Sequence, residues 1–396
     1  MHRIGIYGGS FNPPHIGHVQ AARQAYQALG LEKILLIPDS VAPHKTFPEG
    51  TPTPQQRYEM IRLAAEDCPE LEISDLELQR PGISYTCETV AALRQEYPED
   101  QLYLIMGSDM FLSFETWKEY ESLLKTVNLA VLYRGDRGEK EKIDKQKEKL
   151  EALGGHIFLV ENEITEISST QLRRLLAFGS TEAFLCPKVA AYIKDQGLYH
   201  TAANWKNLPM EKLEQIMELL MKPKRFAHAK RVRDTAIALA KRWGENEVDA
   251  GRAGMLHDAT KALDGPLQLT LSSAYGKMLD DFSRENPKTL HAYTGAVVAR
   301  YIFGENDRVV AAIRSHTTGK TDMNLLETII YVADYMEPGR DFPGVERLRE
   351  LAFSDIYGAL RLGMEMTLEH LKNQGSTISP ETKQALDWLK INYDTP

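Results

Sequence analysis

One stretch, GGSFNPPHIGH at residues 8–18, constrains the fold of this chain more than any other part of it. An apolar run at residues 3–7 precedes the stretch and predicts a buried parallel strand. Residues 19–29 follow it with apolar side chains at helical spacing. Because Gly8 and Gly9 lack a Cβ, the backbone between strand and helix can approach a ligand closely. The sequence therefore predicts a strand, a glycine turn that binds a ligand, and a helix.

The residues of the predicted turn suit an anion. The helix that follows would direct free N–H groups and the positive end of its dipole into the turn, as phosphate-binding helices do. His15 and His18 are three residues apart, so both imidazoles project from one side of a first helical turn. Two imidazoles could donate hydrogen bonds to phosphoryl oxygens as charge develops there. The alternative is a capped loop with two surface histidines, which a short motif does not exclude.

Strands and helices alternate through the rest of the first half. Strands are expected at residues 33–37, 101–106, 127–132 and 156–160, and helices at 55–67, 84–96 and 139–152. This alternation predicts an α/β fold with a doubly wound parallel sheet. In such sheets the ligand crevice lies at the carboxyl ends of the strands.

Several polar residues follow the predicted strands and are candidates for the crevice. Lys45 follows the second strand and could neutralise a phosphate, although a lone loop lysine is more often solvated. Asp109 follows Gly107 and could position a ribose or a metal, or simply cap the next helix. Trp117 could stack on an aromatic ring or fill the core. Residues 167–173 join hydroxyls to a helix start, with Arg173 one turn in, which predicts a second phosphate cradle or an ordinary Ser/Thr cap.

Taken together, these blocks resemble the H-x-G-H nucleotidyltransferase superfamily, and GGSFNPPHIGH is most similar to the bacterial nicotinate-nucleotide adenylyltransferases. The resemblance covers a first domain at residues 1–203. It implies a Rossmann-like domain that adenylylates nicotinate mononucleotide with ATP and Mg²⁺, giving deamido-NAD and pyrophosphate. It also implies site residues: catalytic His15 and His18; ATP-binding Gly8, Gly9, Ser10, Phe11, Ser168, Ser169 and Arg173; and substrate-binding Lys45, Thr86, Gly107, Asp109, Trp117 and Arg134.

The first domain departs from the family pattern at one point, and two other functions are alternatives for it. The family often has a proline between the residues that match Arg134 and Gly135, and this chain lacks it. Another phosphate acceptor, such as phosphopantetheine or a sugar phosphate, stays open, although Trp117 and Lys45 favour a nicotinate ring. A class I aminoacyl-tRNA synthetase also carries H-I-G-H, but no K-M-S-K-S motif is present, and a net charge of −9 does not suit tRNA.

The second half has a different pattern. Residues 200–212 are polar and contain Pro209, which predicts a short linker. Beyond it strand signals almost vanish, and an all-α domain is expected at residues 210–396. Its helices are predicted at residues 211–221, 227–243, 247–257, 289–302, 307–315, 325–335, 357–373 and 381–392.

Histidines and aspartates lie within or at the ends of these apolar helices. They are His228, His257, Asp258, His291, His316 and Asp334. One buried histidine is usually a satisfied core residue, but four with two acids need a shared reason. Imidazoles and carboxylates suit Fe, Mn, Zn or Mg, and a buried carboxylate is costly without a cation. The absence of cysteine ligands argues against a structural zinc site.

The pair His257-Asp258, with distant histidines on either side, resembles the HD-domain metal phosphohydrolases. The resemblance implies two divalent metals, iron or manganese, with Asp258 bridging. His228, His257 and Asp334 would hold one ion, and His291 and His316 the other. Lys261, one turn after Asp258, could meet a phosphate or the leaving group.

Two further segments narrow this second match. Residues 315–319 (SHTTG) and 333–340 (ADYMEPGR) resemble the small bacterial HD proteins that split diadenosine tetraphosphate symmetrically into two ADP. The sequence therefore predicts a bifunctional enzyme. A general nucleotide phosphohydrolase, or a metal-binding module without catalysis, is the alternative for the second domain.

Composition restricts the partners and the compartment. The net charge of −9 disfavours a broad nucleic-acid surface, and three scattered cysteines argue against a disulfide framework. No apolar run of about 18 residues and no signal-peptide pattern are found, so a cytoplasmic enzyme without membrane contact is expected. Its partners would be the nucleotides named above, and a homo-oligomer is left open.

Overall fold

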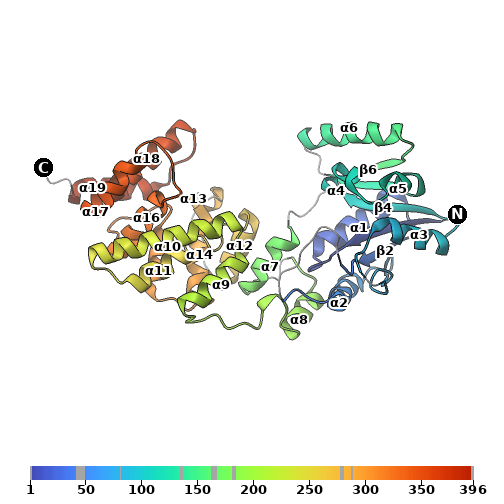
Figure 1. Ribbon diagram of the computed structural model, residues 1–396, viewed down its shortest axis with the longest axis horizontal. Helices are drawn as coiled ribbons and strands as arrows, with labels where there is room; N and C mark the ends of the chain where they lie inside the picture. The colour runs from blue at the N-terminus through green and yellow to red at the C-terminus, as the bar shows by residue number, and fades with distance from the viewer. Residues whose placement is uncertain are drawn as a thin grey trace. The chain divides into compact units, whose positions relative to one another are not determined.

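The computed structural model describes residues 2–41, 50–80, 82–133, 137–161, 167–180, 184–276, 281–286 and 289–393. The chain divides into two compact units. The first comprises residues 1–177 and 181–202, and the second comprises residues 178–180 and 203–396. Strands appear only in the first unit among the described residues (Figure 1).

A six-stranded parallel sheet forms the centre of the first unit, in the order β3-β2-β1-β4-β5-β6. Its strands are β1 (Arg3–Gly9), β2 (Lys33–Pro38), β3 (Leu71–Ile73), β4 (Gln101–Gly107), β5 (Asn128–Tyr133) and β6 (Ile157–Glu161). The predicted doubly wound fold is confirmed. Strand β3 was not expected, because three residues are too few to show a period in the sequence.

Helices surround this sheet. They are α1 (Ile16–Leu29), α2 (Pro54–Ala65), α3 (Thr86–Glu96), α4 (Ser108–Leu112), α5 (Tyr120–Thr126), α6 (Arg137–Ala152), α7 (Ser169–Ala177) and α8 (Pro187–Asp195), with 3₁₀ turns η1 (Phe114–Thr116) and η2 (Leu198–His200). Both faces of the sheet are therefore covered, which explains why its strands are almost continuously apolar.

The order of the strands indicates where a ligand can bind in the first unit. β1 pairs with β2 on one side and with β4 on the other, and successive strands run outward in opposite directions from this pair. A topological switch point of this kind opens a crevice at the carboxyl ends of the two strands. Gly9 ends β1, and Gly107 ends β4. The two predicted ligand-binding segments thus begin at neighbouring strand ends.

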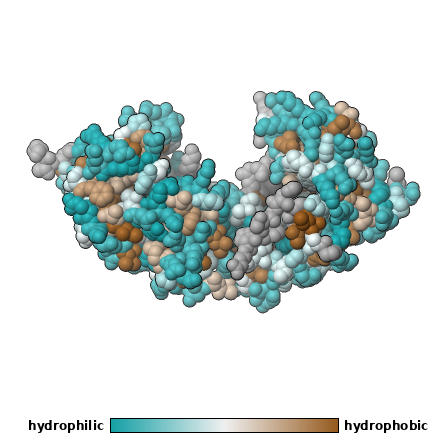
Figure 2. All heavy atoms as spheres, in the orientation of Figure 1, coloured by the Kyte–Doolittle hydropathy of each residue, from teal (hydrophilic) through white to brown (hydrophobic). Residues whose placement is uncertain are grey.

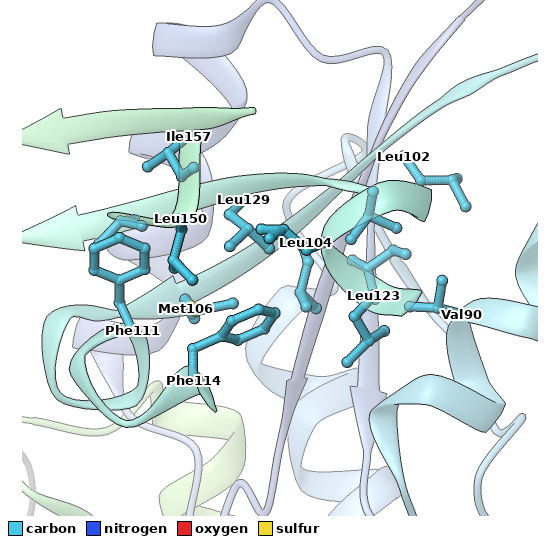
Figure 3. Packing of buried hydrophobic residues seen from close by; sticks show 14 of the residues in the cluster. Val90, Leu102, Leu104, Met106, Phe111, Phe114, Leu123, Leu129, Leu150 and Ile157 are labelled. Carbon is cyan, nitrogen blue, oxygen red and sulfur yellow. The ribbon is translucent and has the colours of Figure 1, made fainter. Parts of the chain in front are cut away.

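Alternate residues of each strand enter two separate cores. One contains Leu104 and Met106 of β4 together with Phe111 and Phe114 from the segment that follows (Figure 3). The other lies beneath α1, where a Cβ on Gly5 would come within 2.8 Å of the Ile34 side chain. Side chains of β2 and β4 therefore close over Gly5, and Ala21, Ala22 and Ala25 of α1 belong to the same core.

The second unit is all-α in its described residues. Its helices are α9 (Met210–Leu220), α10 (Pro223–Trp243), α11 (Glu247–Leu256), α12 (Gly265–Ala274), α13 (Asp281–Glu285), α14 (Leu290–Tyr301), α15 (Asp307–Ser315), α16 (Leu325–Met336), α17 (Val345–Ser354), α18 (Ile356–Asn373) and α19 (Pro380–Tyr393). Helix α10 packs on α11 and α16, and α15 packs on α11, α14 and α16. These five helices carry the predicted metal ligands.

The surface of both units is largely polar. Figure 2 shows hydrophilic residues over most of the visible face, with hydrophobic residues in small separate patches. Within the described ranges, no helix combines the length and the apolar character that crossing a membrane would require.

Candidate functional sites

The turn after β1 is buried and closely packed. Ser10, Phe11, Asn12 and His15 are each at most 8% exposed. Phe11 has a left-handed backbone (φ 43°), and its ring lies edge-on to Tyr7 and His18, at centroid distances of 5.9 and 5.3 Å. A non-glycine residue in this conformation is uncommon and is held only by its surroundings. The aromatic contacts provide that support and fix the path of the turn.

The two histidine rings of the turn lie against each other, with centroids 3.8 Å apart and planes tilted by 39°. The backbone N–H of His15 donates to Nδ1 of His18 at 3.1 Å. A neutral His18 ring therefore carries its proton on Nε2, from which it can donate to a ligand. Burial lowers the pKa of His15 to about 4, so this ring is neutral at physiological pH. Its Nδ1 atom is buried and has no hydrogen-bond partner within the described residues.

The second predicted phosphate segment packs against this turn. The Ser169 hydroxyl donates to the carbonyl of Pro13 at 3.1 Å, and the Arg173 guanidinium donates to the carbonyl of Asn12 at 2.7 Å. The Ser168 hydroxyl accepts from the N–H of Gln171 at 3.2 Å, as a helix cap does. Residues more than 150 positions apart in the sequence thus meet at the start of α1.

Two residues that the sequence did not suggest hold the turn in place. Arg57 on α2 is 1% exposed, and its guanidinium donates to the Ser10 carbonyl at 2.7 Å and to the Asp39 carboxylate at 2.8 Å. The Ser10 hydroxyl donates to the other oxygen of Asp39 at 2.6 Å. Asp39 directly follows β2. Because the ligand crevice lies at the carboxyl ends of the strands, its position in the sequence could have marked it as a candidate. Arg57 lies mid-helix, where no local signal marks it.

The candidate acceptor residues have separate surroundings. A Cβ on Gly107 would come within 2.9 Å of the Asp109 carboxylate, so a side chain here would displace that carboxylate. Gly107, not Asp109, is the N-cap of α4. Burial, and after it the charge of Asp109, raises the pKa of Tyr7 to about 12, which places Asp109 on the β1 side of the crevice. Trp117 lies against Phe114 with ring centroids 5.4 Å apart.

The remaining acceptor residues are only partly placed. Thr86 is the first residue of α3. Lys45 and Arg134 lie outside the described residues. These assignments therefore stay predictions.

In the second unit, the predicted metal ligands converge from five helices. Donor atoms of His228, His257 and Asp334 all lie within 4.8 Å of one another, and so do those of His257, Asp258 and His316. Ligands about 2.1 Å from one ion are separated by roughly 3 to 4 Å, so each group can close around a cation with small side-chain shifts.

Hydrogen bonds at the outer nitrogens orient the histidines. Nδ1 of His257 donates to the Gly254 carbonyl at 2.7 Å, and Nδ1 of His316 donates to the Ile313 carbonyl at 2.7 Å. These bonds hold the ring proton on Nδ1 and leave the Nε2 lone pair toward the cluster. This is the arrangement of metal-binding histidines in general.

His228 is oriented by a buried carboxylate, Glu337, which lies 3.1 Å from its Nδ1. Burial raises the pKa of Glu337, but hydrogen bonds from Arg231 and the Gly339 N–H outweigh it and hold the pKa at about 2. The ionised carboxylate accepts a hydrogen bond from Nδ1–H of His228. Nε2 of His228 lies 3.0 Å from the Asp334 carboxylate. Sequence analysis did not single out Glu337, which is paired with His228 only by the packing of α10 on α16.

His291 contacts both Asp258 and His316. Its Nε2 lies 3.3 Å from the Asp258 carboxylate and 3.2 Å from Nε2 of His316. Lys261 places its Nζ 3.0 Å from Nε2 of His291. The cluster therefore contains the six predicted ligands and the predicted lysine in continuous contact.

Two arginines also reach the acids of the cluster. Arg225 donates to Asp258 at 2.6 Å, and Arg340 donates to Asp334 at 2.7 Å. Both are more than one third exposed, so their guanidinium groups lie where the cluster meets solvent. Cations at such a rim suit a phosphate ligand.

Comparison with known proteins gives a separate match for each of the two units. Residues 6–175 match the cytidylyltransferase-like family, and residues 225–339 match the HD domain. A protein of Pelobacter propionicus named "probable nicotinate-nucleotide adenylyltransferase" is 35% identical over 212 residues, which are 50% of this chain and 98% of the relative. A protein of the same name from Aeromonas salmonicida is 39% identical over 209 residues, 50% of this chain and 96% of the relative.

A solved structure is also similar to part of the chain. It is described as a predicted HD superfamily hydrolase involved in NAD metabolism from Clostridium acetobutylicum. Its sequence is 34% identical, and the match covers 46% of this chain and 97% of that one with a TM-score of 0.45.

Proposed function

The chain belongs, through its first half, to the nicotinate-nucleotide adenylyltransferase family, and we propose that this half joins ATP to nicotinate mononucleotide. One observation carries the proposal. The turn at residues 8–18 and the segment at residues 168–173 meet at the switch point of the sheet, joined by the bonds from Ser169 and Arg173. Each segment alone is consistent with a helix cap, but two helix starts facing one crevice suit a polyphosphate.

The reaction is an in-line displacement that needs no covalent intermediate. An oxygen of the mononucleotide phosphate attacks the α-phosphorus of ATP and forms a new P–O bond. The bond from this phosphorus to the bridging oxygen breaks, and pyrophosphate leaves with the electron pair. ATP enters as its Mg²⁺ complex, so the ion is part of the substrate. The products are deamido-NAD and pyrophosphate.

The protein contributes position and charge stabilisation. His18 donates from Nε2 beside the start of α1. His15, neutral because of its burial, can donate without carrying a charge that would need solvation. Such preorganised donors are the main source of rate in phosphoryl transfer. Gly8 and Gly9 allow the phosphates to approach the backbone.

Nicotinate mononucleotide is the proposed acceptor, held by Asp109, Thr86 and Trp117 with Lys45 and Arg134. In a steady-state assay of the full chain, we expect a higher kcat/KM for the nicotinate form than for its amide, because a buried polar group left unmatched is costly. Equal values for the two would contradict the proposed acceptor. Transfer to phosphopantetheine or a sugar phosphate, with none to nicotinate mononucleotide, would support the alternative.

For the second half, we propose a two-metal phosphohydrolase that cuts diadenosine tetraphosphate into two ADP. The observation that carries it is the shared orientation of His228, His257 and His316, whose Nδ1 atoms are bonded outward. His228, His257 and Asp334 would hold one ion, and His291 and His316 the other, with Asp258 touching both. The donor set of imidazole and carboxylate fits iron or manganese. When bound, two such ions activate water and neutralise phosphate charge.

The chain's own cations complete this site. Lys261, Arg225 and Arg340 are positioned to bind phosphate oxygens and to orient the tetraphosphate chain. In metal analysis of protein purified without oxygen, we expect two ions per chain. In an assay with diadenosine tetraphosphate, we expect ADP as the only product. AMP plus ATP would show that a different phosphorus is presented and would exclude symmetrical cleavage. Two bound ions without hydrolysis of any nucleotide would favour a binding module.

A further inference from the structure

The glycine turn holds a buried donor that the reaction above does not use. Asn12 is 2% exposed, and both of its oxygens accept hydrogen bonds. Its carbonyl accepts from Arg173 at 2.7 Å, and its Oδ1 accepts from the Tyr199 hydroxyl at 2.6 Å. Its Nδ2 is buried and has no hydrogen-bond partner in the described part of the chain. Buried polar groups in native proteins are nearly always bonded, so an exception requires an explanation.

The orientation of the Asn12 amide is set by Tyr199. Burial raises the pKa of the Tyr199 phenol well above its usual value, so the hydroxyl keeps its proton and can donate. A donated hydrogen bond selects the oxygen of the amide and not its nitrogen, which fixes the side chain against a flip. Nδ2 therefore lies on the side of the amide away from Tyr199. An NH₂ group only donates, so its missing partner must be an acceptor.

A second buried polar atom of the same turn also has no hydrogen-bond partner among the described residues. It is Nδ1 of His15, three residues along the chain. Both residues lie just before or at the N-cap of α1. Two unpartnered polar atoms beside an anion-binding helix start indicate a ligand, and a phosphate oxygen is the acceptor that this position favours.

We propose that Asn12 is a further phosphate-binding residue of the adenylyl-transfer site and that Tyr199 is its positioning residue. Nδ2 of Asn12 donates to an oxygen of the ATP phosphate chain, and the Tyr199 hydroxyl keeps the amide in the donating orientation. The inference rests on the proposed function of the first half. It adds to that function a donor outside the two histidines.

The backbone around Tyr199 supports a specific role. Tyr199 and His200 both have left-handed backbones, with φ of 53° and 66°, and Gly197 precedes them at φ 60°. Two consecutive non-glycine residues in this region are strained, and such strain persists only where surrounding contacts impose it. The turn delivers a buried phenol to Asn12 from 187 residues away in the sequence. The last element of the first unit thereby reaches the phosphate site.

Asn12→Asp in the full chain is the decisive variant. It keeps the shape of the side chain and the acceptor for Tyr199, and replaces the Nδ2 donor with a carboxylate oxygen, which also repels a phosphate when ionised. We expect kcat/KM for ATP to fall by about 10²–10³, as on loss of an oxyanion donor. Asn128→Asp, at the opposite end of the sheet in β5, is the matched control and should leave the rate unchanged. An Asn12→Asp enzyme with the wild-type kcat/KM would overturn the proposal.

Tyr199→Phe separates positioning from structure. Removing the hydroxyl frees the amide to turn, so we expect about a tenfold fall in kcat/KM. In an Asn12→Ala background, the same substitution should cause no further fall, because Tyr199 then has no amide to orient. Additive losses in this double-mutant cycle would show that Tyr199 acts through the fold and would contradict its assigned role.

A binding measurement keeps the proposal testable by itself. Calorimetric titration of the full chain with a non-hydrolysable ATP analogue needs no acceptor, and Asn12→Ala should weaken the affinity at least tenfold. If the wild type binds the analogue in this way but transfers nothing to nicotinate mononucleotide, the proposed function fails and the role of Asn12 stands. If the wild type is active and Asn12→Ala binds and reacts as the wild type does, the role of Asn12 fails.

Discussion

The two candidate sites of this chain differ in what they lack. The turn at the end of β1 contains buried polar groups without partners among the described residues, namely the His15 imidazole and the Asn12 amide, and it needs an anion. The cluster in the second unit contains lone pairs and carboxylates, and it needs cations. The first is assembled from loops at strand ends, the second from side chains inside packed helices. The comparison teaches that the unsatisfied groups of a site identify the charge of its ligand before the ligand is known.

The largest expected effect is on the cation site. Asp258→Ala removes the carboxylate that is proposed to touch both ions, so both should be lost and hydrolysis should fall to background. His316→Ala should spare the ion held by His228, His257 and Asp334. Metal content per chain and ADP release measure these outcomes. Adenylyl transfer should not change in either variant, and a parallel loss of it would break the separation of the two sites.

The anion site should show the next largest effect. His18→Ala removes a donor proposed to act on the developing charge, so kcat for adenylyl transfer should fall by about 10²–10³. Thermal unfolding and metal content serve as controls and should stay as in the wild type. An unaffected kcat would mean that His18 only caps α1.

A smaller effect is expected from the residue that orients a metal ligand. Glu337→Gln keeps the size of the side chain but weakens its hold on His228, so metal affinity should fall by about 10- to 100-fold. Competition with a chelator measures this affinity without any assay of hydrolysis. Glu346→Gln, in an exposed first turn of α17, is the matched control. Equal affinities for Glu337→Gln and the wild type would show that the carboxylate plays no part in metal binding.

The smallest expected effect concerns pH. The pKa of His15 is about 4 in the folded chain against an unfolded value near 6.5, so the unfolded state binds the proton more readily. The contribution of neutral His15 is therefore complete above pH 6.5 and is lost as pH falls toward 4. Between pH 7 and 5.5 the loss in unfolding free energy is about 1 kcal/mol.

His15→Gln provides the comparison for this loss. Glutamine does not titrate, so the difference between wild type and variant should shrink as pH falls through this window. Denaturant unfolding followed at the transition of the first unit measures it. A difference that stays constant from pH 7 to 5.5 would show that His15 is not buried as a neutral ring.

Much of the architecture was readable from the sequence. The apolar run before Gly8 and the helical spacing after His18 are local patterns, and the alternation that follows them predicts a doubly wound sheet. The confirmed change to helices after Pro209 is local in the same sense. Strand β3 was missed because its three residues carry no period, and the order of the strands is not written in any single segment.

What the sequence determined by itself is chemistry at short range: which residues could bind phosphate, and which could bind metal. The tertiary structure alone decided how these residues are supported. Arg57 and Tyr199 have no neighbouring motif, and Glu337 stands in the segment at residues 333–340 with nothing there to name its partner. These three residues hold Ser10, Asn12 and His228 from distant elements. A buried polar group must find its partner wherever packing brings one, and the packing depends on the whole chain. Local patterns can therefore name a binding residue, whereas only the fold shows which distant side chain orients it.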